Sequence, residues 1–271
     1  MTTTEDHMDR TNADDADLGG EIELGSALFT LVEPHRGREV EYNRWYERDH
    51  FYAGCMVGPW YFAGRRWVAT RDLKDQRITS DAGPLFGDDR LGSYLATYWV
   101  LKGRFEENTD WSLRQVHWLH TNGRMFAERD HIHTLLYMYG GAEARDEDGV
   151  PPELALDHPY AALGAVIVEK RGDGAFPRPT AALAAGSPVA QVLSFTAVPL
   201  PADAPVTQPG TEGLEKRELQ LWFAEDEPGA WWDRARAYAD EVSASGAGVV
   251  RWASPFIPTI PGTDTYTDQL W

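Results

Sequence analysis

Cysteines, basic residues and long apolar runs are all scarce in this chain of 271 residues. Cys55 is the only cysteine, which excludes a disulfide within the chain and favours a reducing compartment, the cytoplasm. The 25 Lys and Arg are outnumbered by 43 Asp and Glu, and they form no basic cluster for nucleic-acid phosphates or an anionic membrane. The longest apolar stretch, around Ala161–Val168, is far shorter than the roughly 20 residues that span a bilayer. We therefore expect neither nucleic acid nor membrane as a partner.

Apolar and aromatic residues are plentiful by contrast, at 42% and 12% of the chain, with 11 Trp. That supply is enough for a sizeable core. Two acidic stretches have little to bury. We interpret residues 1–20 as a disordered tail and residues 143–160, which hold Pro151-Pro152, as a linker. The folded units then span residues 21–142 and 161–271.

The pattern of apolar residues predicts the same order of elements in both units. The first unit has predicted strands at 24–32, 60–70, 94–101 and 132–139, with helices at 39–56 and 111–120. The second has predicted strands at 163–170, 192–198, 218–223 and 249–257, with helices at 180–185 and 228–244. This β-α-β-β-α-β order is the ferredoxin-like arrangement, an α+β fold.

A ferredoxin-like sheet leaves one face uncovered by its helices, so two units can press these faces together around a cavity. Alternation along the strand at 132–139 suggests which residues would line it. His131, His133 and Tyr137 fall on one face, with Leu135 and Tyr139. The other face, which includes Ile132 and Thr134, would pack on the helices.

The segment Glu41-Tyr42-Asn43-Arg44-Trp45-Tyr46, followed by His50, resembles the helix motif of EthD-like proteins. Gly58-Pro59-Trp60 and the closing segment 255–271 are similar to other parts of that family. The family belongs to the dimeric α+β-barrel superfamily, so the resemblance implies that the two units form such a barrel within one chain. The second unit lacks the motif, which suggests that its own cavity is vestigial. The superfamily includes cofactor-free monooxygenases, polyketide cyclases, isomerases, dehydratases and haem enzymes.

Asn43, Tyr46 and His50 share one helix face, being spaced at i, i+3 and i+7. An imidazole suits acid/base work near neutral pH, and a phenol can polarise a carbonyl or hold an oxyanion. We predict His50, His133 and Tyr46 as catalytic residues. The predicted substrate-binding residues are Asn43, His131, Tyr137, Trp67 and Trp99, since aromatic side chains suit a flat ligand.

His117 and His120, at i and i+3 on the second helix, form a weaker alternative metal site. A haem, which needs one axial histidine and an apolar slot, is another alternative. The sequence holds no G-x-S-x-G, P-loop or G-x-G-x-x-G signature.

Together these features favour a cofactor-independent enzyme of the EthD-like type, a lyase or isomerase. It would use histidine acid/base chemistry on a small hydrophobic carbonyl compound, aromatic or polycyclic. Two alternatives stay open: a cofactor-free monooxygenase acting on a phenol or anthrone, and a non-catalytic binding protein. Whether the chain dimerises again is also open.

Overall fold

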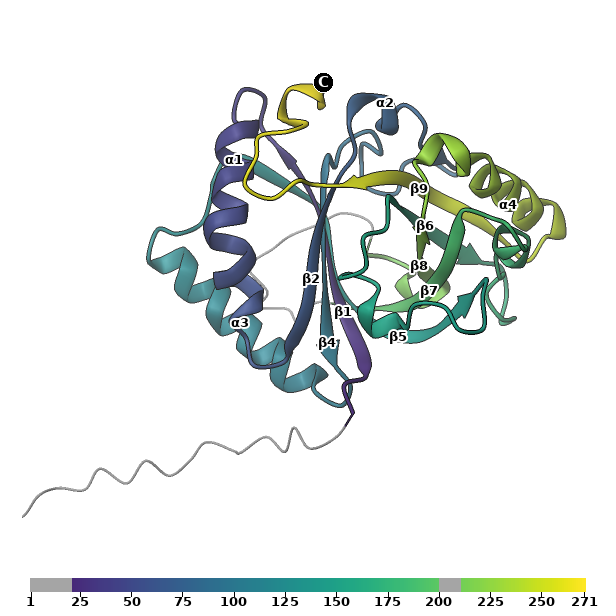
Figure 1. Cartoon of the computed structure of the whole chain (residues 1–271), viewed down its shortest axis with the longest axis horizontal. Coiled ribbons are helices and arrows are strands. Elements are labelled where there is room, and N and C mark those ends of the chain that lie inside the picture. Colours follow the sequence, from purple (N-terminus) through teal and green to yellow (C-terminus); the bar gives the residue numbers. More distant parts are fainter. Residues whose placement is uncertain (1–20, 200–210) are drawn as a thin grey trace, which may run out of the picture.

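The computed structural model describes residues 21–199 and 211–271 (Figure 1). The predicted acidic tail, 1–20, lies outside the described residues. Within the described ranges the strands form one antiparallel sheet in the order β2-β4-β1-β5-β7-β8-β6-β9-β3, and a further pairing of β2 with β9 closes it. None of the helices in these ranges is long and apolar enough to cross a membrane.

The first unit consists of four long strands and two helical crossovers. Its strands are β1 (Leu24–Pro34), β2 (Tyr61–Val68), β4 (Tyr94–Leu101) and β5 (Arg129–Ala144). Its helices are α1 (Glu39–Trp45), continued by the π-helical turns η1 (Tyr46–His50) and η2 (Tyr52–Met56), and α3 (Phe105–Thr121). The short α2 (Arg71–Lys74) and β3 (Ile78–Thr79) lie between β2 and β4.

The second unit repeats this order with a reduced first crossover. Its strands are β6 (Ala162–Lys170), β7 (Val189–Val198), β8 (Arg217–Ala224) and β9 (Gly248–Pro258), and its long helix is α4 (Trp232–Ser245). The helix predicted at 180–185 is a single 3₁₀ turn, η4 (Thr180–Leu183). Further short 3₁₀ turns are η3 (Pro152–Leu154), η5 (Leu214–Lys216), η6 (Pro228–Ala230) and η7 (Thr267–Gln269).

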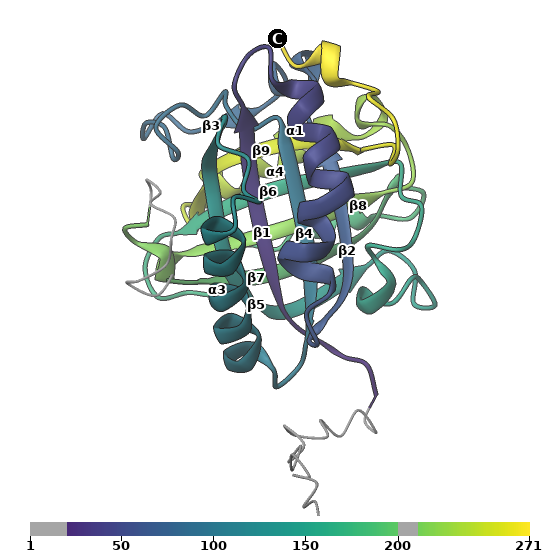
Figure 2. The same cartoon turned by 90° about the vertical axis from the view of Figure 1, so that its left-hand side faces the viewer.

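Both units have the ferredoxin-like strand order. It runs β5-β1-β4-β2 in the first unit and β9-β6-β8-β7 in the second. The units meet at two seams, where β5 pairs with β7 and β2 pairs with β9. Figure 2 shows the strands of the two units crossing, with α1 and α3 covering the outer face of the first. The prediction of two fused ferredoxin-like units that form a barrel within one chain is confirmed.

Two predicted boundaries were wrong. Helix α3 begins at Phe105 rather than after Asp110, and Glu106 and Glu107 in its first turn favour that start through the helix dipole. Strand β5 was predicted to end at Gly140-Gly141 but continues to Ala144. It passes through an irregularity at Gly141, whose φ of +135° suits glycine. The first two residues of the predicted linker 143–160 therefore belong to β5.

The barrel interior is a packed core rather than the expected cavity. Large aromatic side chains from both units fill it, including Phe29, Trp67, Trp99, Phe223 and Trp252. A void of about 10 Å³ borders this core, lined by residues that include Phe86, His133 and Tyr137. The two open faces thus meet as predicted, but among the described residues large side chains occupy the space where a cavity was expected.

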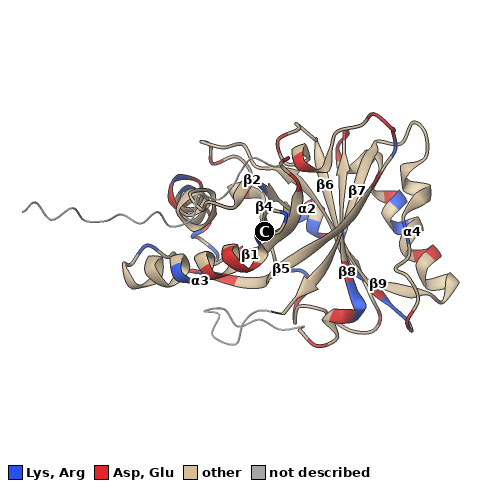
Figure 3. Cartoon of the chain, turned by 90° about the horizontal axis from the view of Figure 1, so that it is seen from below, with Lys and Arg blue, Asp and Glu red and all other residues tan. Residues whose placement is uncertain are grey.

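Charged residues are dispersed along the chain in both units, with acidic positions interspersed among the basic ones (Figure 3). Several pair across the units. Arg44 on α1, for example, forms an ion pair with Asp264 in the C-terminal segment. The end of the second unit is therefore fastened to the first helix of the first unit.

Candidate active site

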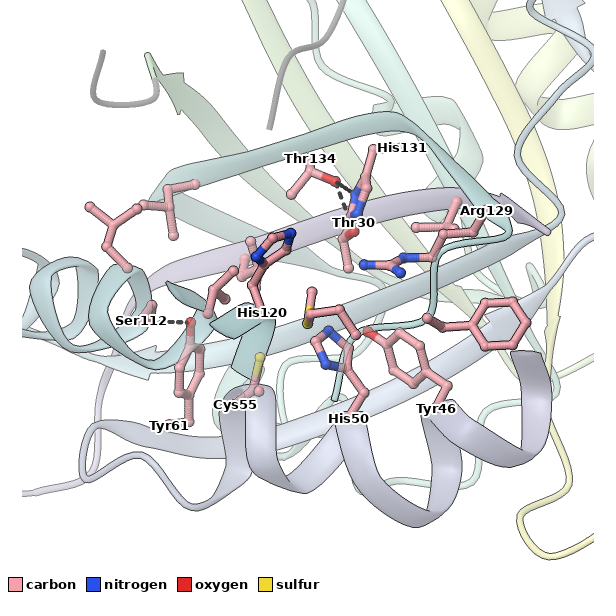
Figure 4. Close-up of a pocket in the computed structure, with 18 of the residues that line it drawn as sticks. Thr30, Tyr46, His50, Cys55, Tyr61, Ser112, His120, Arg129, His131 and Thr134 are labelled. Atoms are coloured by element: carbon pink, nitrogen blue, oxygen red, sulfur yellow. Dashed lines mark hydrogen bonds between the residues drawn. The ribbon is translucent and has the colours of Figure 1, made fainter. Parts of the chain in front are cut away.

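A pocket of about 410 Å³ lies between the outer face of the first unit's sheet and the helices α1–η2 and α3 (Figure 4). This volume is in the ordinary range for small-molecule sites. Much of its wall is apolar, from residues such as Leu28, Val32, Leu113, Val116 and Phe126. Its polar side chains come from Thr30, Tyr46, His50, Cys55, Tyr61, Thr109, Ser112, His120, Arg129, His131 and Thr134. No Asp or Glu is among the described residues that line it.

The first crossover helix widens where it meets the pocket. Beyond Trp45 the α-helix gives way to the two π-helical turns η1 and η2. Such turns are rare and are often found at functional sites. They present Tyr46, His50, Gly54 and Cys55 to the pocket.

His50 is tightly held between its neighbours. Its ring stacks on Trp45, with ring centroids 4.4 Å apart, and meets Tyr46 edge-on at 5.2 Å. A Cβ at Gly54 would lie 3.0 Å from His50 Cε1, so glycine makes room for the ring. The buried Nδ1 has no hydrogen-bond partner among the described residues. Burial, with the positive charge of Arg129, lowers the pKa of His50 to about 3, so the ring is neutral at pH 7.

Tyr46 contributes its ring to the pocket and its hydroxyl to a buried pair. The hydroxyl lies 2.9 Å from that of Tyr98, and the guanidinium of Arg66 lies 4.5 Å from the ring centroid. Burial raises the pKa of Tyr46, so it stays protonated. Cys55 is buried nearby, and burial raises the pKa of its thiol to about 12. The thiol is therefore not a ready nucleophile.

A β-bulge separates two histidines that were predicted to share a face. On β1, Leu31 pairs with His133 and Val32 pairs with His131, which leaves Ile132 as an extra residue. His131 consequently faces the helices and lines the pocket, whereas His133 faces the barrel interior. The prediction of one shared face was wrong, and Ile132 belongs to the barrel core rather than to the helix side.

His131 lies at one end of a short hydrogen-bonded chain. Its Nδ1 is 2.9 Å from Thr134 Oγ1, which is 2.8 Å from Thr30 Oγ1. Burial and the charge of Arg129 lower the pKa of His131 to about 4. The pocket therefore holds two neutral imidazoles, one on the helix and one on the strand.

His133 and Tyr137 form a separate pair in the barrel. His133 Nε2 lies 2.6 Å from the Tyr137 hydroxyl, and Phe86 packs against the imidazole with ring centroids 4.9 Å apart. Burial lowers the pKa of His133 to about 3. Both residues border the small void rather than the pocket. They lie on the opposite face of the sheet from His50, so the two predicted catalytic histidines are not brought together.

Besides Tyr137, three further predicted binding residues lie outside the pocket. Trp67 and Trp99 are fully buried in the barrel core, where Trp99 Nε1 donates to the Pro152 carbonyl at 3.1 Å. Asn43 is also buried. Its Nδ2 donates to the Thr263 carbonyl at 2.9 Å, and its Oδ1 accepts from Arg66 at 2.9 Å. Asn43 thus ties the C-terminal segment to α1.

His117 and His120 both lie on α3 but do not form a common site. His120 lines the pocket, while His117 is exposed. No group of three or more His, Cys, Asp or Glu in the described ranges is placed to hold a metal ion.

Arg129 is one of the pocket residues that the sequence pattern did not predict. It begins β5 and shares the pocket face with His131 because the bulge comes after both. Its guanidinium lies 4.8 Å from the centroid of Trp45. Its position two residues before His131 was the available signal, but strict alternation would have placed both in the barrel. Thr30 and Thr134 were missed for the related reason that the helix side was expected to be packed.

Among its described residues, the second unit has side chains where the first has the pocket. Its helix side is filled by a cluster that includes Trp222, Trp231, Trp232 and Tyr238. The rings of Trp231 and Trp232 pack against each other with centroids 5.4 Å apart. The pocket geometry therefore belongs to the first unit.

Comparison with known proteins identifies the fold. No protein-family model matches the chain, and a search of curated proteins gave no significant match. A solved structure provisionally assigned as a chlorite dismutase matches with a TM-score of 0.50 and 11% identity, covering 92% of this chain and 100% of its own. A variant of DypB from Rhodococcus jostii RHA1 in complex with heme matches with a TM-score of 0.50 and 8% identity, covering 92% and 96%. An anthrone oxidase-like protein matches at 0.46 and 9%, covering 89% and 95%.

The fold is that of the dimeric α+β barrels. At these identities the likeness shows the fold alone. This chain supplies both halves of the barrel, and only the first half carries the pocket described above.

Proposed function

We propose that the chain is an enzyme that moves protons on a small, largely apolar carbonyl compound, with the pocket of the first unit as its active site. The observation that carries the proposal is His50, a half-buried imidazole on the wall of an apolar pocket whose buried Nδ1 has no hydrogen-bond partner among the described residues. Buried polar atoms in proteins nearly always have partners, and an exception can mark a ligand site or a catalytic task. Of the nine described side-chain atoms that are buried without a hydrogen-bond partner, the one on His50 belongs to a residue that lines the pocket, and the other eight do not. The finer resemblance to EthD-like proteins is part of this proposal.

His50 acts as the general base in this scheme. The neutral ring takes a proton from the carbon next to the substrate carbonyl, and the electron pair of the broken C–H bond moves into the carbonyl to give an enolate. Returning the proton at another carbon isomerises the substrate, whereas expelling a leaving group from the β-carbon makes the enzyme a lyase. The Thr134–His131 pair lies across the pocket and is placed to orient the carbonyl oxygen (Figure 4).

Solvent deuterium exchange tests the proposal without knowledge of the natural substrate. With 2-tetralone in D₂O, the wild-type protein should speed exchange at the carbon next to the carbonyl, measured by NMR. His50→Gln should lose most of this acceleration, because removing a general base costs about 10²–10⁴-fold. His117→Gln, at an exposed position on the same unit, is the control. Equal rates for wild type and His50→Gln would refute the assignment. Oxygen uptake with anthrone would redirect it to the monooxygenase alternative.

Haem binding is the second candidate function, and the donor set fits it. An iron ligand must be a neutral imidazole with a free nitrogen, and His50 meets both conditions. Arg129 is placed to pair with a propionate. A bound haem would supply redox chemistry, while His50 would hold it and Trp45 would fix the ring of His50. Titration with haemin is the test: a Soret band that His50→Ala abolishes would support this function, and no band would exclude it.

A further inference from the structure

The charge of Arg129 has no counter-ion in the pocket that it lines. The ion pairs and hydrogen bonds of the described residues include none made by its guanidinium, and no acidic side chain among those residues lines the pocket. The guanidinium of Arg129 instead lies over the face of the Trp45 ring. A partly buried cation without a partner loses hydration without regaining an equal interaction.

Two other arginines with little solvent exposure have partners of a kind that Arg129 lacks. Arg66 contacts Asn43 at 2.9 Å and Glu47 at 3.5 Å, although its Nη2 has no hydrogen-bond partner among the described residues. Arg77 donates to the backbone carbonyls of Asp89, Leu91 and Gly92 at 2.6 to 2.9 Å. These two guanidinium groups are held by protein acceptors, whereas that of Arg129 faces the pocket.

The neighbours of Arg129 add hydrogen-bonding groups but no negative charge. Figure 4 shows its guanidinium pointing into the space between His50 on the helix side and Thr30 and His131 on the strands. Both imidazoles are neutral, and the hydroxyls of Thr30 and Thr134 carry no charge. The remaining wall is mostly apolar, from residues such as Leu113 and Val116. One region of the pocket thus suits an anion and the rest suits rings.

We infer that the pocket binds an anionic aromatic compound, one whose carboxylate, sulfonate or phenolate group is held by Arg129 while its rings lie on the apolar wall. This inference rests on the proposed function for the identity of the site and names its substrate class. An anion paired with Arg129 would remove the cost of the lone cation, and charge-assisted bonds to a guanidinium are among the strongest available to a small ligand. A neutral polycyclic ketone would leave that cation unpaired.

Two fluorescent probes that differ by one anionic group test the inference. They are 1-anilinonaphthalene-8-sulfonate and N-phenyl-1-naphthylamine, which lacks the sulfonate. The wild type should bind the sulfonate more tightly, at a single site from which the neutral probe displaces it. Arg129→Gln should weaken sulfonate binding by about tenfold or more and change neutral-probe binding less than about twofold. Arg48→Gln, an exposed arginine on η1, should alter neither. Arg129→Lys should lose less affinity than Arg129→Gln.

An equal loss for both probes in Arg129→Gln would overturn the inference, because it would show a structural role. Unchanged sulfonate binding in that variant, or a wild type that favours the neutral probe or binds neither, would also overturn it. Neither probe is turned over, so these outcomes are separate from the deuterium-exchange test. His50→Gln should keep the preference for the sulfonate even if exchange is lost.

Discussion

Mild acid should destabilise this protein, because it buries histidines in their neutral form. His133 is 2% exposed, and burial lowers its pKa from 6.5 to about 3. At pH 7 it is neutral in both the folded and the unfolded chain. Below pH 6.5, His133 binds a proton in the unfolded chain but stays neutral in the folded chain. The stabilisation is therefore fully present above pH 6.5 and is lost as the pH falls towards about 3.

The size of the stability loss follows from the lowered pKa of His133. At pH 5 the solution is about 1.5 pH units below the pKa of His133 in the unfolded chain. At about 1.36 kcal/mol per unit, this difference lowers the free energy of unfolding by about 2 kcal/mol. His50 and His131, with pKa values of about 3 and 4, are lowered by the same cause. Together the three histidines could remove up to about 6 kcal/mol, which is comparable to the whole stability of an ordinary domain.

Urea unfolding followed by tryptophan fluorescence measures this loss. The free energy of unfolding of the wild type should fall steeply between pH 7 and pH 5. In His133→Gln, which keeps a polar side chain but cannot titrate, the fall should be smaller by about 2 kcal/mol. His117→Gln should behave as the wild type because that side chain is exposed. An identical pH dependence in wild type and His133→Gln would refute the reasoning.

Three further outcomes follow from the geometry around the pocket. Gly54→Ala should displace the ring of His50, seen as shifted imidazole NMR signals, at a cost of roughly 1–3 kcal/mol from overpacking, partly offset by about 1 kcal/mol of helix propensity. Cys55 should react with a thiol reagent roughly 100-fold more slowly in the native protein than in urea, given its burial and a pKa of about 12; equal rates would contradict this. Asn43→Ala should lower the free energy of unfolding by about 3 kcal/mol, because it removes the hydrogen bond that Arg66 donates to Asn43 and the one that the Thr263 carbonyl accepts from it; an unchanged urea midpoint would count against that role.

Much of the fold was predictable because its strands are long and apolar. The runs around Tyr94–Leu101 and Ala162–Lys170 are buried along most of their length, so composition alone marks them as strands. The doubled order of elements then indicated two ferredoxin-like units. What the pattern could not show was how tightly the two sheets would pack against each other.

The location of the pocket was mispredicted for a reason of side-chain size. Residues that face the barrel are large, such as Trp67 and Trp99, and they fill the space between the sheets. At the pocket, the strands present two small side chains, Thr30 and Thr134, and η2 presents Gly54, which leaves a gap under α1 and α3. Cores reach nearly crystalline density where large side chains interdigitate, so cavities form where side chains are small.

Some candidate residues could be predicted from spacing within one helix, whereas others depended on how two strands pair. His50 and Tyr46 were found because helical spacing places them on one face, and the π-helical turns keep both on the pocket. His131 and Arg129 depended on the bulge at Ile132, which inserts one residue and reverses the faces on either side of it. A single extra residue of this kind leaves no clear mark in an alternating sequence.

The two seams of the barrel determine whether its halves stay together when the protein is diluted. In a barrel built from two separate chains, pairings such as β5–β7 and β2–β9 would be contacts between molecules and would dissociate at low concentration. Here both seams join parts of one polypeptide, so the second half is present at a fixed effective concentration. The core behind the pocket should therefore remain assembled however far the protein is diluted, and ligand affinity should not depend on protein concentration through these seams.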